Sequence, residues 1–206
     1  MVECVGKLGT KISYWFIIYS LDMKEIVKLA QEYVLRECKK KSNPFGMNAY
    51  NHHFKSVVMY AEQLAKKKNA DKEIVLVSAW LHDIASIKGH YEDHHIFGQD
   101  YAEEFLKKHN YPKERIEKVK HCIYAHRGSR DIPRETIEAE CVSDADAMSH
   151  FNTIASLFYL AIKVRGLNTE EANKFVKEKL ERSYKKLTSE GKSLIKDKYE
   201  SVMKIL

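Results

Sequence analysis

The shortage of turn-forming residues restricts the fold of this chain more than any other feature. Eight glycines and three prolines are spread over 206 residues, which leaves little room for the turns of an all-β protein. Apolar residues recur instead at helical spacing, as in the series Ile26, Ala30, Tyr33 and Val34, which lie on one face of a helix. The sequence therefore predicts an all-α fold, a bundle of several helices.

The apolar spacing and the helix-ending residues predict where these helices lie. Asp71 is placed to cap a helix, and Asn168 with Glu171 forms a capping-box pattern at the start of another. The segment Ser189-Glu190-Gly191 is interpreted as the break before the last helix. We expect a first helix over about 23–40 and a second that carries His53 and ends in the run 66–69. A third follows Asp71 and contains 74–81, a fourth runs over about 92–109, and a fifth starts near Pro112 and carries His126. A sixth contains 144–158, a seventh opens at Asn168, and the last ends at Leu206.

The chain is expected to form one helical domain over 23–206, with a core at 45–165 and C-terminal helices at 166–206. Residues 1–22 are interpreted as an N-terminal extension of doubtful relevance, because Met23 opens an amphipathic helix. The apolar stretch 13–21 falls short of the ~20 residues that span a bilayer and lacks a small-residue cleavage site. We therefore expect no membrane association.

Charge and cysteine content indicate a soluble, reduced protein. The net charge of +6 comes from lysines that are spread along the chain, which favours a solvated surface over a nucleic-acid interface. The four cysteines form no Cys-x-x-Cys pair, and a chain of this length needs no disulfides. We predict a cytoplasmic protein, in which apolar stripes on the last two helices would suit a homodimer.

His82-Asp83, at the end of the apolar run 74–81, is the first sign of chemistry. That run is apolar on nearly all sides, which predicts a buried helix, although its β-branched residues also suit a strand. Burying an imidazole and a carboxylate is costly without compensation. A divalent metal compensates both, because it binds neutral histidine and ionised aspartate together. The pair by itself also fits an exposed helix end.

Other histidines make the metal interpretation stronger. His53, His94 and His126 each fall on the apolar face of a different expected helix, whereas His52 lies about 100° away from His53. A single inward histidine is usually structural. Ligands that project inward from several helices are a recurrent way to build a metal site in a bundle.

With these residues, the sequence resembles the HD-domain superfamily of metal-dependent phosphohydrolases. His53, the run Leu81-His82-Asp83-Ile84-Ala85 and Asp144-Ala145-Asp146-Ala147-Met148 resemble its H…HD…D signature, over roughly residues 45–165. The resemblance implies an HD-type all-α bundle around an internal metal. It implies as ligands His53, His82, Asp83 and Asp146, with Asp144 as the alternative to the last, and for a second metal His94 and His126.

The resemblance also implies hydrolysis of a small phosphorylated substrate, such as a nucleotide, by a metal-activated water. Asp83 and His82 would be the catalytic residues, and the divalent ion would be Mn, Fe, Ni, Co, Zn or Mg. We expect the remaining phosphate charge to be bound by Lys88, Arg127 and Arg130. Two other functions stay open: a mixed-valent di-iron oxygenase, and a non-catalytic module that binds a nucleotide or RNA.

Overall fold

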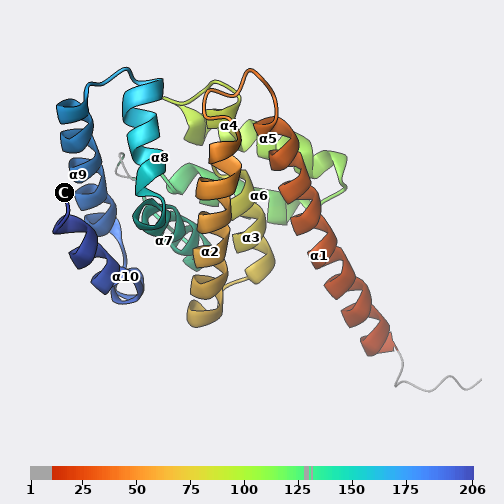
Figure 1. Ribbon diagram of the computed structural model, residues 1–206. Helices are drawn as coiled ribbons and strands as arrows, with labels where there is room; N and C mark the ends of the chain where they lie inside the picture. The colour runs from red at the N-terminus through yellow and green to blue at the C-terminus, as the bar shows by residue number, and fades with distance from the viewer. Residues whose placement is uncertain (1–10, 128–129, 131) are drawn as a thin grey trace, which may run out of the picture.

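The structure is a computed structural model that describes the backbone of residues 11–127, 130 and 132–206, and the side chains from residue 25 onward (Figure 1). Every regular element in this part of the chain is a helix, which confirms the predicted all-α fold. The first ten residues of the predicted extension lie outside the described residues. None of the described helices combines the length and hydropathy that crossing a bilayer requires.

The elements follow one another with short connections. In chain order they are α1 (Lys11–Cys38), η1 (Ala49–Phe54), α2 (Lys55–Lys68), α3 (Lys72–Leu81), α4 (Ile84–Ile87), α5 (His94–Lys108), α6 (Lys113–Ala125), α7 (Ile137–Asn152), α8 (Ile154–Tyr159), η2 (Leu160–Val164), α9 (Thr169–Lys186) and α10 (Ser189–Met203). The elements η1 and η2 are π-helical, a form that is rare and often found at functional sites.

Helix α1 begins earlier than predicted. We expected its start at Met23, but the helical backbone runs from Lys11. No glycine or proline lies between residues 11 and 38, so nothing in that stretch ends the helix. The predicted boundary of the extension is therefore not a break in secondary structure.

Helix α3 lies at the centre of the bundle, in contact with α1, α2, α6 and α7. The Asp71 side chain caps it by accepting hydrogen bonds from the backbone N–H groups of Glu73 and Ile74. Eight of its ten residues are buried, so the apolar run is a helix enclosed on all sides rather than a strand. A buried helix fixes the position of the residues that follow it, His82 and Asp83.

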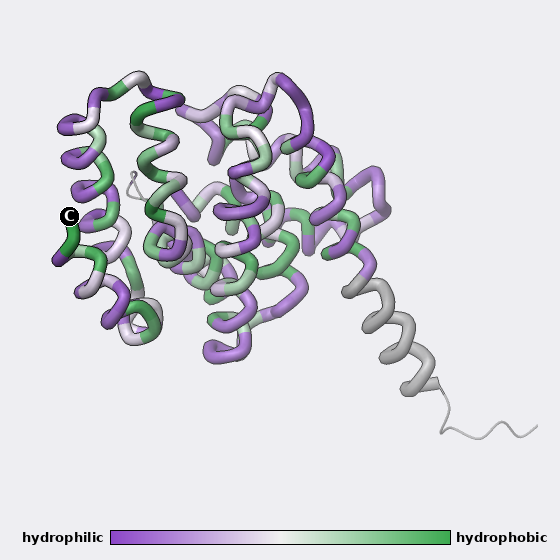
Figure 2. The backbone as a smooth tube through the Cα atoms, viewed as in Figure 1, coloured by the Kyte–Doolittle hydropathy of each residue, from purple (hydrophilic) through white to green (hydrophobic). Residues whose placement is uncertain are grey.

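The other helices surround α3 with one apolar face each. Helix α2 packs along α7, and α5 packs along α6. Helices α9 and α10 cover α7 at one end of the molecule, and α1 extends from the other end (Figure 1). Hydrophobic and hydrophilic residues alternate along the helices (Figure 2), as expected when each helix buries one side.

The junction of α9 and α10 differs from the prediction. The capping box of Asn168 and Glu171 is present at the start of α9, but Ser189–Gly191 is the first turn of α10 and not a break. The break lies at Leu187 and Thr188, and the Thr188 side chain caps α10. Gly191 is needed for close packing, because a Cβ atom there would lie 2.6 Å from Asp144 Oδ2.

Candidate metal centre

His82 follows the last residue of α3 and is fully buried. Its Nδ1 lies 2.8 Å from the carbonyl oxygen of Ala79, and a carbonyl can only accept, so Nδ1 carries the ring proton. Burial lowers the pKa of His82 to about 3, which keeps the ring neutral. The Nε2 atom therefore presents an unprotonated lone pair to the interior.

His53, on η1, presents its Nε2 in the same way. Its Nδ1 lies 3.2 Å from Ser149 Oγ, and that hydroxyl donates its own proton to the carbonyl of Asp146 at 2.7 Å. The serine then accepts from His53 Nδ1–H, so in the neutral ring the lone pair is on Nε2. The Nε2 atoms of His53 and His82 lie 3.1 Å apart.

A second histidine pair repeats this arrangement. His94, at the start of α5, directs Nδ1 to the carbonyl of Tyr91 at 2.6 Å, and His126, at the end of α6, directs Nδ1 to the carbonyl of Ile123 at 2.5 Å. Burial lowers the pKa of His94 as well. The Nε2 atoms of these two rings lie 3.2 Å apart.

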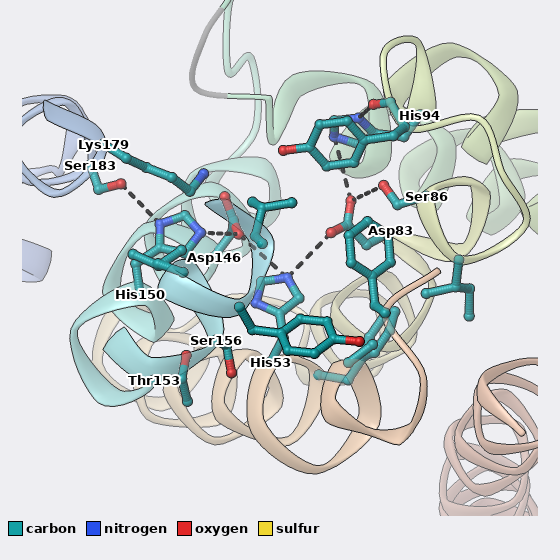
Figure 3. A pocket seen from close by; sticks show the side chains of 18 of the residues that line it. His53, Asp83, Ser86, His94, Asp146, His150, Thr153, Ser156, Lys179 and Ser183 are labelled. Atoms are coloured by element: carbon teal, nitrogen blue, oxygen red, sulfur yellow. Dashed lines mark hydrogen bonds and ion pairs between the residues drawn. The ribbon is translucent and has the colours of Figure 1, made fainter. Parts of the chain in front are cut away.

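Asp83 lies between the two histidine pairs. Its Oδ2 is 3.3 Å from His53 Nε2, whereas its Oδ1 is 3.4 Å from His94 Nε2. Oδ1 also accepts a hydrogen bond of 3.0 Å from Ser86. Figure 3 shows the Asp83 carboxylate between His53 and His94. One carboxylate therefore serves both pairs, with one oxygen for each.

Of the two candidate aspartates on α7, Asp146 faces the histidines. Its Oδ1 lies 3.8 Å from His53 Nε2, and its Oδ2 lies 3.2 Å from the Lys186 ammonium. Burial opposes ionisation, but Lys186 holds the pKa of the Asp146 carboxyl well below its ordinary value. Asp144 is fully buried elsewhere, bound by Arg134 and Thr188. Positions two apart on a helix differ by about 200°, so only one of the two can face the site.

These residues fit a divalent metal. Imidazole nitrogens that both carry lone pairs repel one another at 3.1–3.2 Å unless a cation lies between them. Histidine ligands of metals characteristically donate the other ring N–H to a carbonyl or a similar acceptor, as all four do here. Three overlapping groups have ligand atoms within 4.8 Å of one another. They are His53/His82/Asp83, Asp83/His94/His126 and His53/Asp146/His150.

The third group contains a residue that the sequence analysis missed. His150 lies one helical turn after Asp146 on α7, with Nε2 3.6 Å from Asp146 Oδ1 and Nδ1 2.9 Å from Ser183 Oγ of α9. Burial holds the pKa of His150 well below its ordinary value. Its four-residue spacing from Asp146 is a signal that could have identified it.

The site opens into a cavity of about 450 Å³. Of the cations predicted to contact phosphate, Arg127 lines this cavity. Lys88 does not, because its ammonium lies 3.5 Å from Glu37 and 4.4 Å from the ring centre of Tyr101. Arg130 is exposed and is not part of the lining. The lining cations that the sequence did not single out are Arg165, Lys179, Arg182 and Lys186.

Comparisons with known structures agree on the fold. The Lin1889 protein of Listeria innocua has a TM-score of 0.62 at 19% identity, covering 88% of this chain and 91% of that chain. YpgQ of Bacillus subtilis, solved in complex with ADP, has a TM-score of 0.63 at 21% identity, covering 89% and 93%. A Lactobacillus plantarum protein has a TM-score of 0.67 at 20% identity, covering 87% and 92%.

No curated protein matches the chain in sequence. The HD domain family does match it, over residues 50–150, and that range contains His53, the His82-Asp83 pair and Asp146. The helices of this range are those that bring both histidine pairs together around Asp83. Residues 50–150 of the chain are therefore an HD domain.

Proposed function

We propose that this protein is a metal-dependent phosphohydrolase that cleaves a phosphate ester or anhydride of a nucleotide or a similar small metabolite. The observation that carries the proposal is the set of four histidines whose Nδ1 atoms contact oxygen acceptors and whose Nε2 atoms converge on Asp83. Neutral imidazoles and ionised carboxylates are the protonation states that divalent metals require. A bound metal would lower the pKa of a coordinated water and neutralise phosphoryl oxygens.

The chain's own residues would hold and orient the reacting groups. Asp83 is placed to bind on both of its oxygens, which supports two metal positions, one at each histidine pair. Ser86 donates to Asp83 and fixes the orientation of its carboxylate. Lys186 holds Asp146 by an ion pair of 3.2 Å and also donates to the carbonyl of His126. These contacts keep the ligand atoms in place before substrate arrives.

An aromatic wall of the cavity, beside His94, supports an organic substituent on the phosphate. The Arg165 guanidinium lies 5.5 Å from the ring centre of Tyr91 and 4.9 Å from that of Phe175. Phe45 packs against Tyr91 with ring centres 5.8 Å apart. Aromatic and guanidinium planes are surfaces on which a planar base stacks. The ADP bound to the structurally similar YpgQ is consistent with a nucleotide.

The same ligands would also suit a di-iron oxygenase, because Asp83 can join two metal positions in either case. The cations that line the cavity favour phosphate chemistry, since a neutral organic substrate has no need of them. Measurement of oxygen consumption by iron-loaded protein separates the two functions. Hydrolysis consumes no oxygen.

The test compares two adjacent histidines. His53→Ala removes an inward ligand, whereas His52→Ala removes an exposed neighbour on the same element. Wild-type protein and His52→Ala should bind about two divalent ions per chain and release phosphate or pyrophosphate from a panel of nucleotides. His53→Ala should lose bound metal and at least about 100-fold of the turnover. Full metal content and turnover in His53→Ala would contradict the proposal, as would metal-loaded wild-type protein that hydrolyses nothing in the panel.

A further inference from the structure

We infer that Lys179 binds a second phosphate group, so that the site selects compounds with two or more linked phosphates over monophosphates. The inference rests on the proposed function, because that function identifies the cavity as a phosphate site. It adds a residue that determines specificity and a substrate class.

Lys179 makes no close polar contact with a described residue, and the attraction of Asp146 and Asp83 acts on it only at longer range. Its ammonium makes no hydrogen bond or ion pair with the described residues, although its side chain lines the cavity. The nearby Lys186 differs, because its ammonium pairs with Asp146 at 3.2 Å. Figure 3 shows the Lys179 side chain extending from α9 toward Asp146. An ammonium group that is partly removed from water without a close anion lowers the stability of the fold. Burial accordingly lowers the pKa of Lys179.

The position of Lys179 on α9 places it between the two ends of the cavity. Phe175, Lys179, Ser183 and Lys186 follow at spacings of four, four and three residues, so they lie on one face of the helix. At one end of this face Phe175 contacts Arg165. At the other end Ser183 contacts His150, and Lys186 contacts Asp146. Lys179 therefore lies along the path from the aromatic wall to the metal centre.

Charge on this wall of the cavity is all of one sign. Helix α9 and the residue that follows η2 contribute four cations and no acid to the lining, namely Arg165, Lys179, Arg182 and Lys186. A single phosphate at the metal centre would lie on the Lys186 side of this wall, next to Asp146, and would leave Lys179 without a close anion. A second linked phosphate would supply the missing anion through charge-assisted hydrogen bonds. The unpaired cation is thus explained by a diphosphate or triphosphate chain.

The experiment measures binding without turnover. The ligands are a nucleoside triphosphate with methylene groups in place of its bridging oxygens and the matching nucleoside monophosphate, titrated calorimetrically in excess Mg²⁺. Wild-type protein should bind the triphosphate analogue at least about 10-fold more tightly. Lys179→Met keeps the apolar part of the side chain but removes the charge. It should lower the affinity for the triphosphate analogue about 10- to 100-fold. It should change monophosphate affinity less than about twofold, and Lys179→Arg should retain most of the preference.

Lys177→Met is the matched control, because Lys177 is an exposed lysine on the same helix. It should bind both ligands as the wild type does. The unfolding temperature of Lys179→Met should also equal or exceed that of the wild type, because the change removes a charge that is partly buried without a close anion. A structural role for Lys179 would instead lower the unfolding temperature.

Several results would overturn the inference. One is an equal loss of affinity for both ligands in Lys179→Met, and another is unchanged affinity of that variant for the triphosphate analogue. A third is wild-type protein that binds the analogue no more tightly than the monophosphate. Failure of the proposed function is distinguishable from these results. If the analogue binds through Lys179 but no phosphate compound is turned over, the inference holds and the hydrolase proposal fails. If monophosphates are hydrolysed and Lys179→Met has no effect, the hydrolase proposal holds and the inference fails.

Discussion

Replacement of Asp83 by asparagine tests the metal centre most directly. Asparagine has nearly the shape of aspartate but lacks the charge that both histidine pairs share through Oδ1 and Oδ2. A ligand at 100 times its dissociation constant stabilises the folded state by about 2.7 kcal/mol per site, so two metals contribute about 5 kcal/mol. For a chain of this length that corresponds to about 10–20 °C in unfolding temperature.

The assay is differential scanning calorimetry of wild-type and variant protein with Mn²⁺ and after chelation, together with elemental analysis. Metal should raise the unfolding temperature of the wild type by about 10–20 °C. It should raise the unfolding temperature of Asp83→Asn by less than about a third of the wild-type rise. Asp100→Asn, an exposed aspartate on α5, should behave as the wild type. If Asp83→Asn still binds two metals and keeps the full metal-dependent rise, Asp83 does not connect the two histidine pairs and the reasoning is refuted.

Two further predictions concern stability. Gly191→Ala should destabilise the protein by about 1–3 kcal/mol in urea unfolding, because the new Cβ would lie 2.6 Å from Asp144 Oδ2; a gain in stability, which glycine-to-alanine changes in helices ordinarily produce, would contradict the close packing. Burial opposes ionisation of Asp71, but hydrogen bonds from Arg115 lower its pKa below the ordinary value. The ionised carboxylate therefore stabilises the folded state above about pH 4. That stabilisation is lost as the pH falls through the lowered pKa. The cost of Asp71→Asn, measured by unfolding at pH 7 and pH 3, should therefore shrink in acid, and a cost that grew in acid would show that the ion pair with Arg115 is not its source.

Much of the fold is readable from local patterns. The cap at Asp71, the capping box at Asn168 and the helical nature of the run 74–81 depend on residues within a few positions of one another, and the structure has all three. One prediction that differs from the structure, the start of the last helix, involves a distant neighbour. Gly191 was interpreted as a turn residue, but it is small because Asp144, 47 positions earlier, packs against it.

The sequence by itself determined which side of its helix three of the histidines occupy, because an α-helix repeats every 3.6 residues and an apolar stripe marks the buried side. His53, His94 and His126 were therefore identifiable as inward. Only the tertiary structure decided that Asp146 rather than Asp144 faces them and that α9 brings Lys179 and Lys186 to the cavity. Those relations depend on how α7 and α9 are rotated against their neighbours, and that rotation is set by packing between segments far apart in the chain.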